Sequence, residues 1–215
     1  DMGDVLLYVG ENLSYDNEKI FVKPASELTE YVGDPLSVVC AVNENAITRP
    51  ETHGIKDEEF IRGKAPMTKE EVRTVSLSKL CLAQDSICYD VGAGTGSLSI
   101  EMALRAHQGK VWAIEKKEDA VELIRLNKAK FVADNLEIVE GLAPEALTEL
   151  PVPTHAFIGG SSGNLKEIVK LLIEKNPQVR IVINCITLET VSEALETAKE
   201  FGFEENEIVQ LGAAR

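Results

Sequence analysis

Basic residues, cysteines, aromatics and long hydrophobic runs are all scarce in this chain of 215 residues. Its 22 Lys and Arg stand against 36 Asp and Glu, which gives a formal net charge of −14. A chain this acidic repels phosphate backbones, so nucleic acid is a poor candidate for a partner. The longest apolar runs, such as 179–186, fall well short of the roughly 20 residues that span a bilayer. Acidic residues near position 1 also interrupt any signal-peptide pattern, and we expect no membrane association.

Cysteine and histidine are too few and too scattered to predict a metal site. The four cysteines, Cys40, Cys81, Cys88 and Cys185, form no CxxC pair, and the three histidines form no motif. We therefore interpret the cysteines as small buried hydrophobic residues of a protein kept reduced in the cytoplasm.

The chain divides into a short first part and a longer second part. Residues 1–46 contain two or three strand-like runs, too little to bury an independent core. Residues 47–66 are polar and punctuated by proline and glycine, as in a linker or entry loop. Residues 67–215 are long enough for one full domain, which opens with a helix after Thr68, the expected N-cap.

Strands and helices alternate regularly from residue 86 onward. We expect strands at 86–91, 110–115, 135–139, 154–160, 178–186 and 207–212. We expect helices at 95–106, 117–133, 164–176 and 188–202, and a short one near 144–149. This alternation predicts an α/β fold, with a mostly parallel sheet and helices on both faces.

A glycine-rich loop follows the strand at 86–91 and leads into the next helix. It reads Asp90-Val91-Gly92-Ala93-Gly94-Thr95-Gly96. Glycines allow close approach of a ligand, and the helix that follows presents free N–H groups to it. The third glycine stands at position 96 rather than 97, so the spacing is not that of the dinucleotide fingerprint. The DxGxGxG pattern instead resembles motif I of class I methyltransferases, which bind S-adenosylmethionine and have a Rossmann-like fold.

Two further segments fit the same cofactor. Glu115 ends the next strand, where a carboxylate can accept hydrogen bonds from both ribose hydroxyls. Gly141, Leu142 and Ala143 follow the third strand, where this fold contacts adenine, and Gly141 and Ala143 are small enough to let the base approach. Pro144 also marks a helix start there, which does not exclude the contact.

Longer motifs make a closer resemblance. They are Gly54–Phe60, Pro66–Arg73, Leu77–Leu80, 90–101, Ala143–Leu147 and Phe157–Leu165. On these segments the chain resembles the decarboxylating precorrin methyltransferases of cobalamin biosynthesis, the CbiT type, from about residue 54 to 212. Residues 9–20 and 35–39 resemble the end of a tetrapyrrole methylase domain, the CbiE type, which is often fused ahead of this one.

This resemblance implies a reaction and a set of partners. A methyl group of S-adenosylmethionine would pass to carbon 15 of a precorrin or cobalt-precorrin, leaving S-adenosylhomocysteine, and the acetate at carbon 12 would lose carbon dioxide. The family tends to form homotetramers. The fold normally closes with a strand after 207–212, so its last strand is expected to be truncated here.

The resemblance also carries residue roles. It implies cofactor contact at Thr68, at the loop Gly92, Ala93, Gly94, Thr95 and Gly96, at Glu115 and at Ala143. Asp90, Gly141 and Leu142 are our further candidates for cofactor contact, from their positions in the sequence. Thr68 could equally be only a helix cap. Leu142 stands where the family often has an acid that bonds the adenine amino group, and His155 stands near a common acidic position.

The carboxylates of a precorrin need local positive charge in an acidic protein. Residues 49–80 hold nearly equal numbers of basic and acidic residues, and Arg62, Lys64, Lys69 and Arg73 are our candidates for carboxylate binding. The 159–164 loop lies beside the expected methyl group and adds Gly159, Gly160, Ser161 and Asn164. Solvated charges and a simple turn with a helix cap remain the alternative interpretations.

Other functions remain open at this point. The chain could be a class I methyltransferase of another small molecule, RNA or protein, although its acidity argues against RNA. An NAD-dependent oxidoreductase lacks the required glycine spacing. A non-catalytic module that only binds cofactor is a further alternative. No residue is singled out as a general acid.

Overall fold

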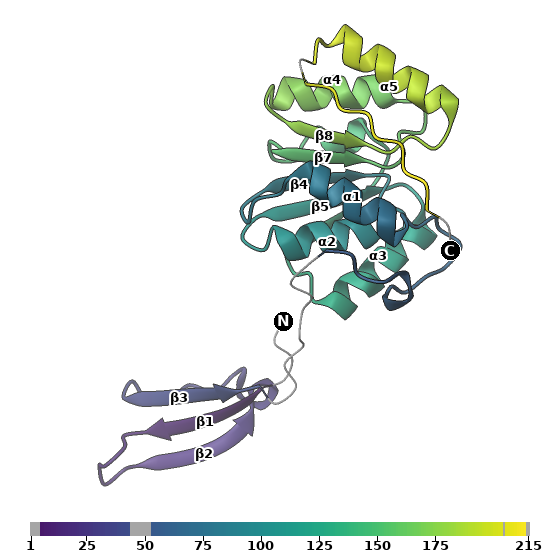
Figure 1. Cartoon of the computed structure of the whole chain (residues 1–215). Coiled ribbons are helices and arrows are strands. Elements are labelled where there is room, and N and C mark those ends of the chain that lie inside the picture. Colours follow the sequence, from purple (N-terminus) through teal and green to yellow (C-terminus); the bar gives the residue numbers. More distant parts are fainter. Residues whose placement is uncertain (1–4, 44–52, 204, 214–215) are drawn as a thin grey trace. The chain divides into compact units, whose positions relative to one another are not determined.

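The computed structural model describes residues 5–43, 53–203 and 205–213. The chain forms two compact units, Asp1–Thr48 and Arg49–Arg215, each with its own sheet (Figure 1). The predicted boundary between residues 46 and 47 falls in 44–52, outside the described residues. Within the described ranges, no helix is both long enough and apolar enough to cross a membrane.

The first unit is a small antiparallel sheet with little core of its own. Its elements are β1 (Leu6–Glu11), β2 (Lys19–Pro24), the 3-10 turn η1 (Ala25–Leu28) and β3 (Ser37–Val42). β1 lies between the other two strands. Only three described side chains of this unit are buried, those of Val5, Val9 and Glu11. Sheets of this size need a hydrophobic face or a packed neighbour to be stable.

The second unit is built on a five-stranded parallel sheet in the order β6-β5-β4-β7-β8. Its strands are β4 (Ile87–Val91), β5 (Lys110–Glu115), β6 (Leu136–Glu140), β7 (His155–Ile158) and β8 (Arg180–Ile183). Its helices are α1 (Glu70–Leu80), α2 (Ser97–Arg105), α3 (Glu118–Phe131), α4 (Leu165–Lys175) and α5 (Leu188–Glu200), with 3-10 turns η2 (Asp57–Glu59) and η3 (Glu145–Leu147). The predicted α/β fold is confirmed.

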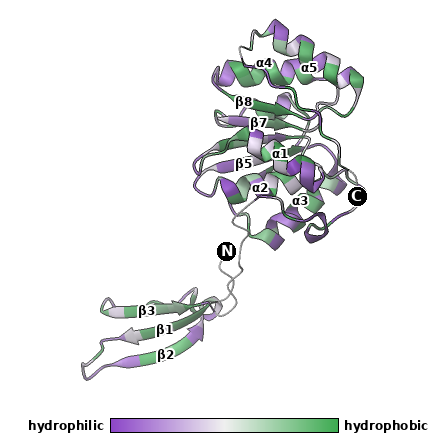
Figure 2. Cartoon of the chain, in the orientation of Figure 1, coloured by the Kyte–Doolittle hydropathy of each residue, from purple (hydrophilic) through white to green (hydrophobic). Residues whose placement is uncertain are grey.

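Helices cover both faces of this sheet, and its strands are largely apolar (Figure 2). Val111 and Ala113 of β5 pack into a core with α1, α2 and α3, whereas Trp112 and Ile114 pack into a second core with α4. Successive side chains of a strand point to opposite faces, so each central strand supplies both cores. This double burial explains why the strands read as continuous hydrophobic runs.

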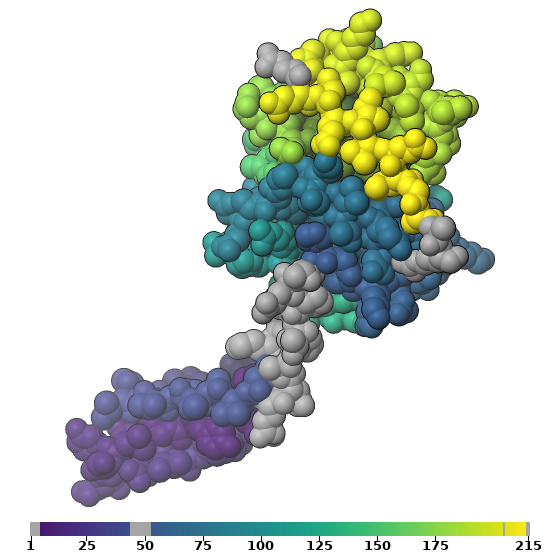
Figure 3. All heavy atoms as spheres, viewed as in Figure 1, coloured from purple at the N-terminus to yellow at the C-terminus, as the bar shows by residue number. Residues whose placement is uncertain are grey.

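The segment at 207–212 does not form the predicted strand. The sheet ends at β8, and the chain after α5 runs over the surface of the second unit in an extended form (Figure 3). Ile208 and Leu211 remain 73% and 46% exposed, and Lys79 holds Glu207 through an ion pair of 2.5 Å. The alternation of apolar residues predicted a strand, but pairing to a neighbour is what makes one, and this segment pairs with none of the described strands.

The predicted cap of α1 is also corrected. The helix begins at Glu70, with Lys69 rather than Thr68 at the N-cap, and no side chain of that residue completes the cap. Instead, the backbone N–H of Glu70 donates to Oδ1 of Asp57, at 3.0 Å. A carboxylate from the preceding turn therefore takes the place that a neighbouring hydroxyl was expected to fill.

The interpretation of the cysteines as buried is wrong for two of the four. Cys40 and Cys81 are exposed, Cys185 is partly buried and Cys88 is fully buried. Cys81 follows α1 in a left-handed conformation at the helix end, which lies at the surface. Burial raises the pKa of the Cys88 thiol to about 12, so this thiol is unreactive.

The core beneath α4 gives a direct test of the packing. Leu172→Ala should lower the free energy of unfolding by about 2–5 kcal/mol, because Leu172 is fully buried and truncation leaves a cavity. Leu126→Ala on α3 is the matched control, since Leu126 is 43% exposed, and its effect should stay within about 0.5 kcal/mol. Urea unfolding measures both, and equal losses would contradict this assignment of the core.

Candidate active site

A cleft of about 300 Å³ lies at the carboxyl ends of the parallel strands. The loops after β4, β5, β6 and β7 form its walls, together with Pro66 and Thr68 from the segment before α1. Its lining residues are Pro66, Thr68, Val91, Gly92, Ala93, Gly94, Ile114, Glu115, Lys116, Lys117, Ala120, Gly141, Leu142, Ala143, Gly159, Gly160, Ser161 and Ser162. This edge of an open α/β sheet is where ligands of such folds bind.

The glycine loop is bare because other backbone segments press against it. A Cβ on Gly92 would lie 2.7 Å from the carbonyl oxygen of Gly160, and one on Gly94 would lie 2.5 Å from that of Pro66. Both glycines also have positive φ, of 76° and 58°. The loop therefore tolerates no side chain at either position, even before a ligand is considered.

Glu115 joins the glycine loop to the end of β5. One carboxylate oxygen accepts from the N–H of Gly94 at 2.9 Å, and the other accepts from those of Lys116 and Lys117 at 2.9 and 3.0 Å. The side chain is 9% exposed and still lines the cleft. A carboxylate oxygen has two lone pairs, so this carboxylate keeps acceptor capacity that can be directed at a ligand.

Three residues of the predicted cofactor set lie behind the cleft wall. Asp90, Thr95 and Gly96 are not among the lining residues, and Asp90 and Thr95 are each 1% exposed. Asp90 accepts a hydrogen bond from the hydroxyl of Ser99, and the carbonyl of Thr95 accepts one from Asn127 at 3.0 Å. In this structure these three residues support the loop from behind the cleft wall, and direct cofactor contact by them stays a prediction.

Burial controls the ionisation of Asp90. It raises the pKa of this carboxyl to about 7; the hydrogen bond from Ser99 opposes the rise and the negative charge of Glu115 adds to it. One carboxyl oxygen, Oδ1, has no hydrogen-bond partner among the described residues. Around neutral pH, Asp90 therefore exchanges between its neutral and charged forms beneath the glycine loop.

The loops after β6 and β7 form two walls that are tied together. Gly141, Leu142 and Ala143 line one wall, and Gly159, Gly160 and Ser161 line the other, as the sequence placed them. Asn164 does not line the cleft. Its side-chain amide instead donates to the carbonyl oxygen of Ala143 at 3.1 Å, and it makes no side-chain cap of α4.

With this geometry established, comparison with known proteins assigns the family. The sequence pattern of the family described as "Precorrin methyltransferase domain" matches residues 59–214. The probable cobalt-precorrin-6B C(15)-methyltransferase (decarboxylating) of Sulfurisphaera tokodaii is 47% identical over 153 residues, covering 70% of this chain and 80% of that protein. That of Methanothermobacter thermautotrophicus is 37% identical over 168 residues, covering 75% and 84%.

Two solved structures agree. The precorrin-6y C5,15-methyltransferase of Geobacter metallireducens superposes with a TM-score of 0.69 at 42% identity, over 72% of this chain and 82% of that one. The precorrin 8w decarboxylase of Methanobacterium thermoautotrophicum superposes with a TM-score of 0.66 at 36% identity, over 70% and 82%. The chain belongs to the precorrin methyltransferase domain family. This membership confirms the family that the motifs indicated and does not favour a dehydrogenase.

The four predicted carboxylate-binding cations of this precorrin methyltransferase domain do not gather at the cleft. Arg62 and Lys64 are exposed but do not line it, and the Lys69 ammonium lies 3.6 Å from Oδ2 of Asp57. Arg73 is fully buried between Asp57 and Glu101, so its assignment to substrate binding is corrected. Helical spacing did not reveal this, because the partners come from distant segments.

Several lining residues were not predicted from the sequence. Lys116 and Lys117 follow Glu115 directly, and both line the cleft. The Lys116 ammonium donates to the hydroxyl of Ser162 at 2.9 Å, which joins the β5 loop to the β7 loop. Their position directly after Glu115, at the end of β5, was the signal in the sequence that could have placed them at the cleft.

The raised pKa of Asp90 makes the pH dependence of stability testable. The folded state holds a proton between about pH 4 and pH 7 that the unfolded state has lost, so stability should fall as pH rises through that window and level off above it. Asp90→Asn cannot titrate and should remove this decline. Urea unfolding across the window measures it.

Ser99→Ala is the companion variant. It removes the hydrogen bond that favours the charged carboxylate, so the decline should extend to higher pH. Parallel pH profiles for the wild type and Asp90→Asn would contradict the assignment.

Proposed function

We propose that the second unit is an S-adenosylmethionine-dependent C-methyltransferase that methylates carbon 15 of a precorrin or cobalt-precorrin, with decarboxylation of the acetate at carbon 12. Membership of the precorrin methyltransferase family supports this, as do the activities for which its relatives are named. The observation that carries it is the cleft at the strand ends, where Glu115 is held by three backbone N–H groups beside a bare glycine loop.

The lining residues suit the parts of this cofactor. Glu115 would accept from the ribose hydroxyls, and the apolar side chain of Leu142, which is 41% exposed, would pack against adenine between Gly141 and Ala143. The remaining part of the donor would lie along Gly92–Gly94, against Pro66 and Thr68. When bound, S-adenosylmethionine supplies an electrophilic methyl group, and the walls serve to fix its direction.

The other end of the cleft suits an anionic acceptor. Gly159, Gly160 and Ser161 leave room beside the donor, and Lys116 and Lys117 add positive charge in a chain whose net charge is −14. Lys116 replaces Arg73 in our set of carboxylate-binding candidates, while Arg62, Lys64 and Lys69 stay in it as exposed cations of the segment that leads to α1. Ammonium groups bind carboxylates through charge-assisted hydrogen bonds.

The chemistry asks little of the protein beyond placement. The ring carbon donates an electron pair to the methyl group while the bond from that methyl group to sulfur breaks, so that S-adenosylhomocysteine leaves. The electrons of the broken carbon–carboxylate bond pass into the conjugated ring as carbon dioxide leaves. A proton from solvent then completes the methyl group left at carbon 12. Holding the two reactants in line supplies much of the rate enhancement in such a step.

For the first unit, we infer that residues 1–46 are the end of a fused tetrapyrrole methylase domain of the CbiE type. Its motifs at 9–20 and 35–39 support this, together with the exposed apolar residues Ile20 and Val38, which are 69% and 64% accessible. Homotetrameric assembly stays a prediction from the resemblance, and cytoplasmic location stays a prediction from the scattered cysteines.

The ribose assignment can be isolated from the structural role of Glu115. Glu115→Ala should weaken binding of S-adenosylhomocysteine by roughly 1–3 kcal/mol, measured by calorimetry. Glu115→Gln keeps the side-chain length and one acceptor, so the same titration with a 2′,3′-dideoxy analogue completes a double-mutant cycle. The wild type should bind the analogue more weakly than S-adenosylhomocysteine, whereas Glu115→Gln should bind the two ligands with nearly equal affinity. Fully additive losses would remove the ribose role, and tighter binding of NAD would reject the methyltransferase assignment.

Lys116 is the sharpest test of the acceptor side. Lys116→Gln should raise KM for the precorrin substrate by about tenfold and leave kcat nearly unchanged, because it removes a charge-assisted contact to the bound ring. Lys170→Gln is the control, since Lys170 is an exposed lysine on α4 paired with Glu174. A KM that moves equally in both variants would exclude a local role for Lys116.

A further inference from the structure

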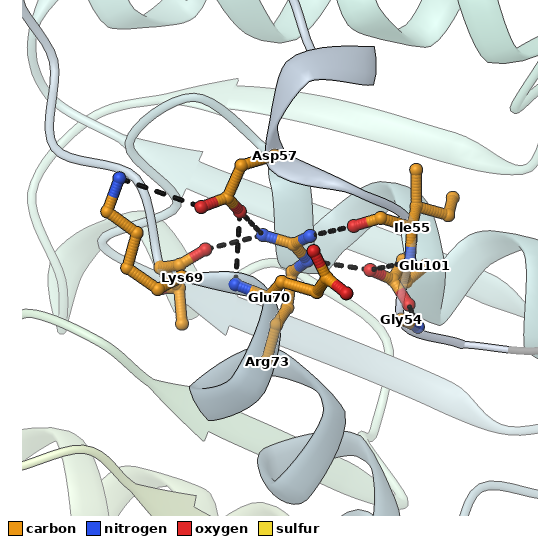
Figure 4. Close-up of polar contacts among 8 residues, drawn as sticks. Gly54, Ile55, Asp57, Lys69, Glu70, Arg73 and Glu101 are labelled. Carbon is orange, nitrogen blue, oxygen red and sulfur yellow. Dashed lines mark hydrogen bonds and ion pairs between the residues drawn. The ribbon is translucent and has the colours of Figure 1, made fainter. Parts of the chain in front are cut away.

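The segment before α1 is held against the rest of the second unit by buried polar side chains. We call residues 54–68 the strap. Glu101 of α2 accepts from the N–H groups of Gly54 and Ile55, at 2.7 and 3.3 Å (Figure 4). Further along, the side-chain amide of Asn127 accepts from the N–H of Ile61 at 2.8 Å and donates to its carbonyl at 3.1 Å. The strap is therefore fastened at its start and near its middle.

Arg73 lies at the centre of this fastening. Its guanidinium is fully buried, and it donates to Glu101 at 2.6 Å, to Asp57 at 3.1 Å and to the carbonyl of Ile55 (Figure 4). It also lies over the ring of Phe60, 4.7 Å from the centroid. A planar fork of donors suits this arrangement, because one side chain can reach two carboxylates and several carbonyls at once.

The charges of the cluster balance. Asp57 and Glu101 face Arg73, and the ammonium of Lys69 lies 3.6 Å from Asp57. Burial acts to raise the pKa of Asp57, but the hydrogen bond and the positive charge of Arg73 outweigh it, so this pKa lies below its ordinary value. Removal of Arg73 would leave two buried carboxylates without their shared partner, and removal of either carboxylate would leave the buried guanidinium with one carboxylate only.

The same guanidinium reaches the end of the strap, at the cleft. Arg73 donates to the carbonyl of Thr68 at 2.5 Å, and Thr68 lines the cleft. Two residues earlier, the Pro66 carbonyl sits over Gly94, where a Cβ would be only 2.5 Å away. Arg73 thus lies directly behind the wall that faces the glycine loop, although it does not itself line the cleft.

We propose that Arg73 is a positioning residue for the methyl donor: held by Asp57 and Glu101, it fixes the Thr68 carbonyl and so keeps the Pro66–Thr68 wall closed against the glycine loop. This inference rests on the proposed use of S-adenosylmethionine in the cleft. It assigns a function to the buried cluster that differs from overall stability, because a loosened wall would weaken donor binding in a protein that remains folded.

The test compares donor affinity with stability in matched variants. Arg73→Lys keeps the charge and loses the fork, and Glu101→Gln is the milder variant, which keeps the side-chain length and one acceptor oxygen. Asn135→Ala is the control, because Asn135 donates to the carbonyls of Ala103 and Ala106, near the far end of α2. Calorimetry with S-adenosylhomocysteine gives Kd, thermal unfolding gives Tm, and hydrogen exchange follows the amides at 67–69.

We expect Arg73→Lys to raise Kd by about tenfold to a hundredfold, with a smaller rise for Glu101→Gln, and both to speed exchange at 67–69. Asn135→Ala should lower Tm and change Kd less than about twofold. If Arg73→Lys does not fold, Glu101→Gln decides alone. Wild-type affinity together with wild-type exchange in the folded variants would overturn the positioning role. Failure of the wild type itself to bind S-adenosylhomocysteine would instead overturn the proposed function.

Discussion

The carboxylate of Glu115 is the interaction on which the cleft depends. It terminates β5 and receives N–H groups from both its own loop and the glycine loop after β4. Because the strands are parallel and in register, these two loops emerge at the same edge. The carboxylate of Glu115 lies between the two loops and accepts hydrogen bonds from both, which ties them together. The other walls are then built outward from this brace, by backbone contact at Gly92 and Gly94.

The fold was predictable because its signals are local. Alternating strands and helices, the glycine loop and the acid after β5 each occupy a few consecutive residues, so the sequence alone led to the correct architecture and to most of the lining residues. The same reasoning wrongly predicted a strand at 207–212, because a strand depends on a partner and the described sheet ends at β8.

The cluster around Arg73 was not predictable for a related reason. Its members stand at positions 54–57, 68–73 and 101, and only the packing of α1 against α2 brings them together. A basic residue on a polar-looking helix is usually solvated, so the sequence favoured a surface role. The Thr68 cap failed in the same way, since Asp57 reaches the helix N-terminus from the preceding turn.

The hydrogen bond between Asn164 and Ala143 affects how the two sides of the cleft can move. It links the wall assigned to adenine with the loop assigned to the acceptor ring. Separation of the two loops would break this hydrogen bond, so we expect a shift of one loop to be passed to the other. On the proposed assignment, a nucleoside that displaces one loop would also change the acceptor side of the cleft, so that the Asn164 amide would couple the binding of the two substrates.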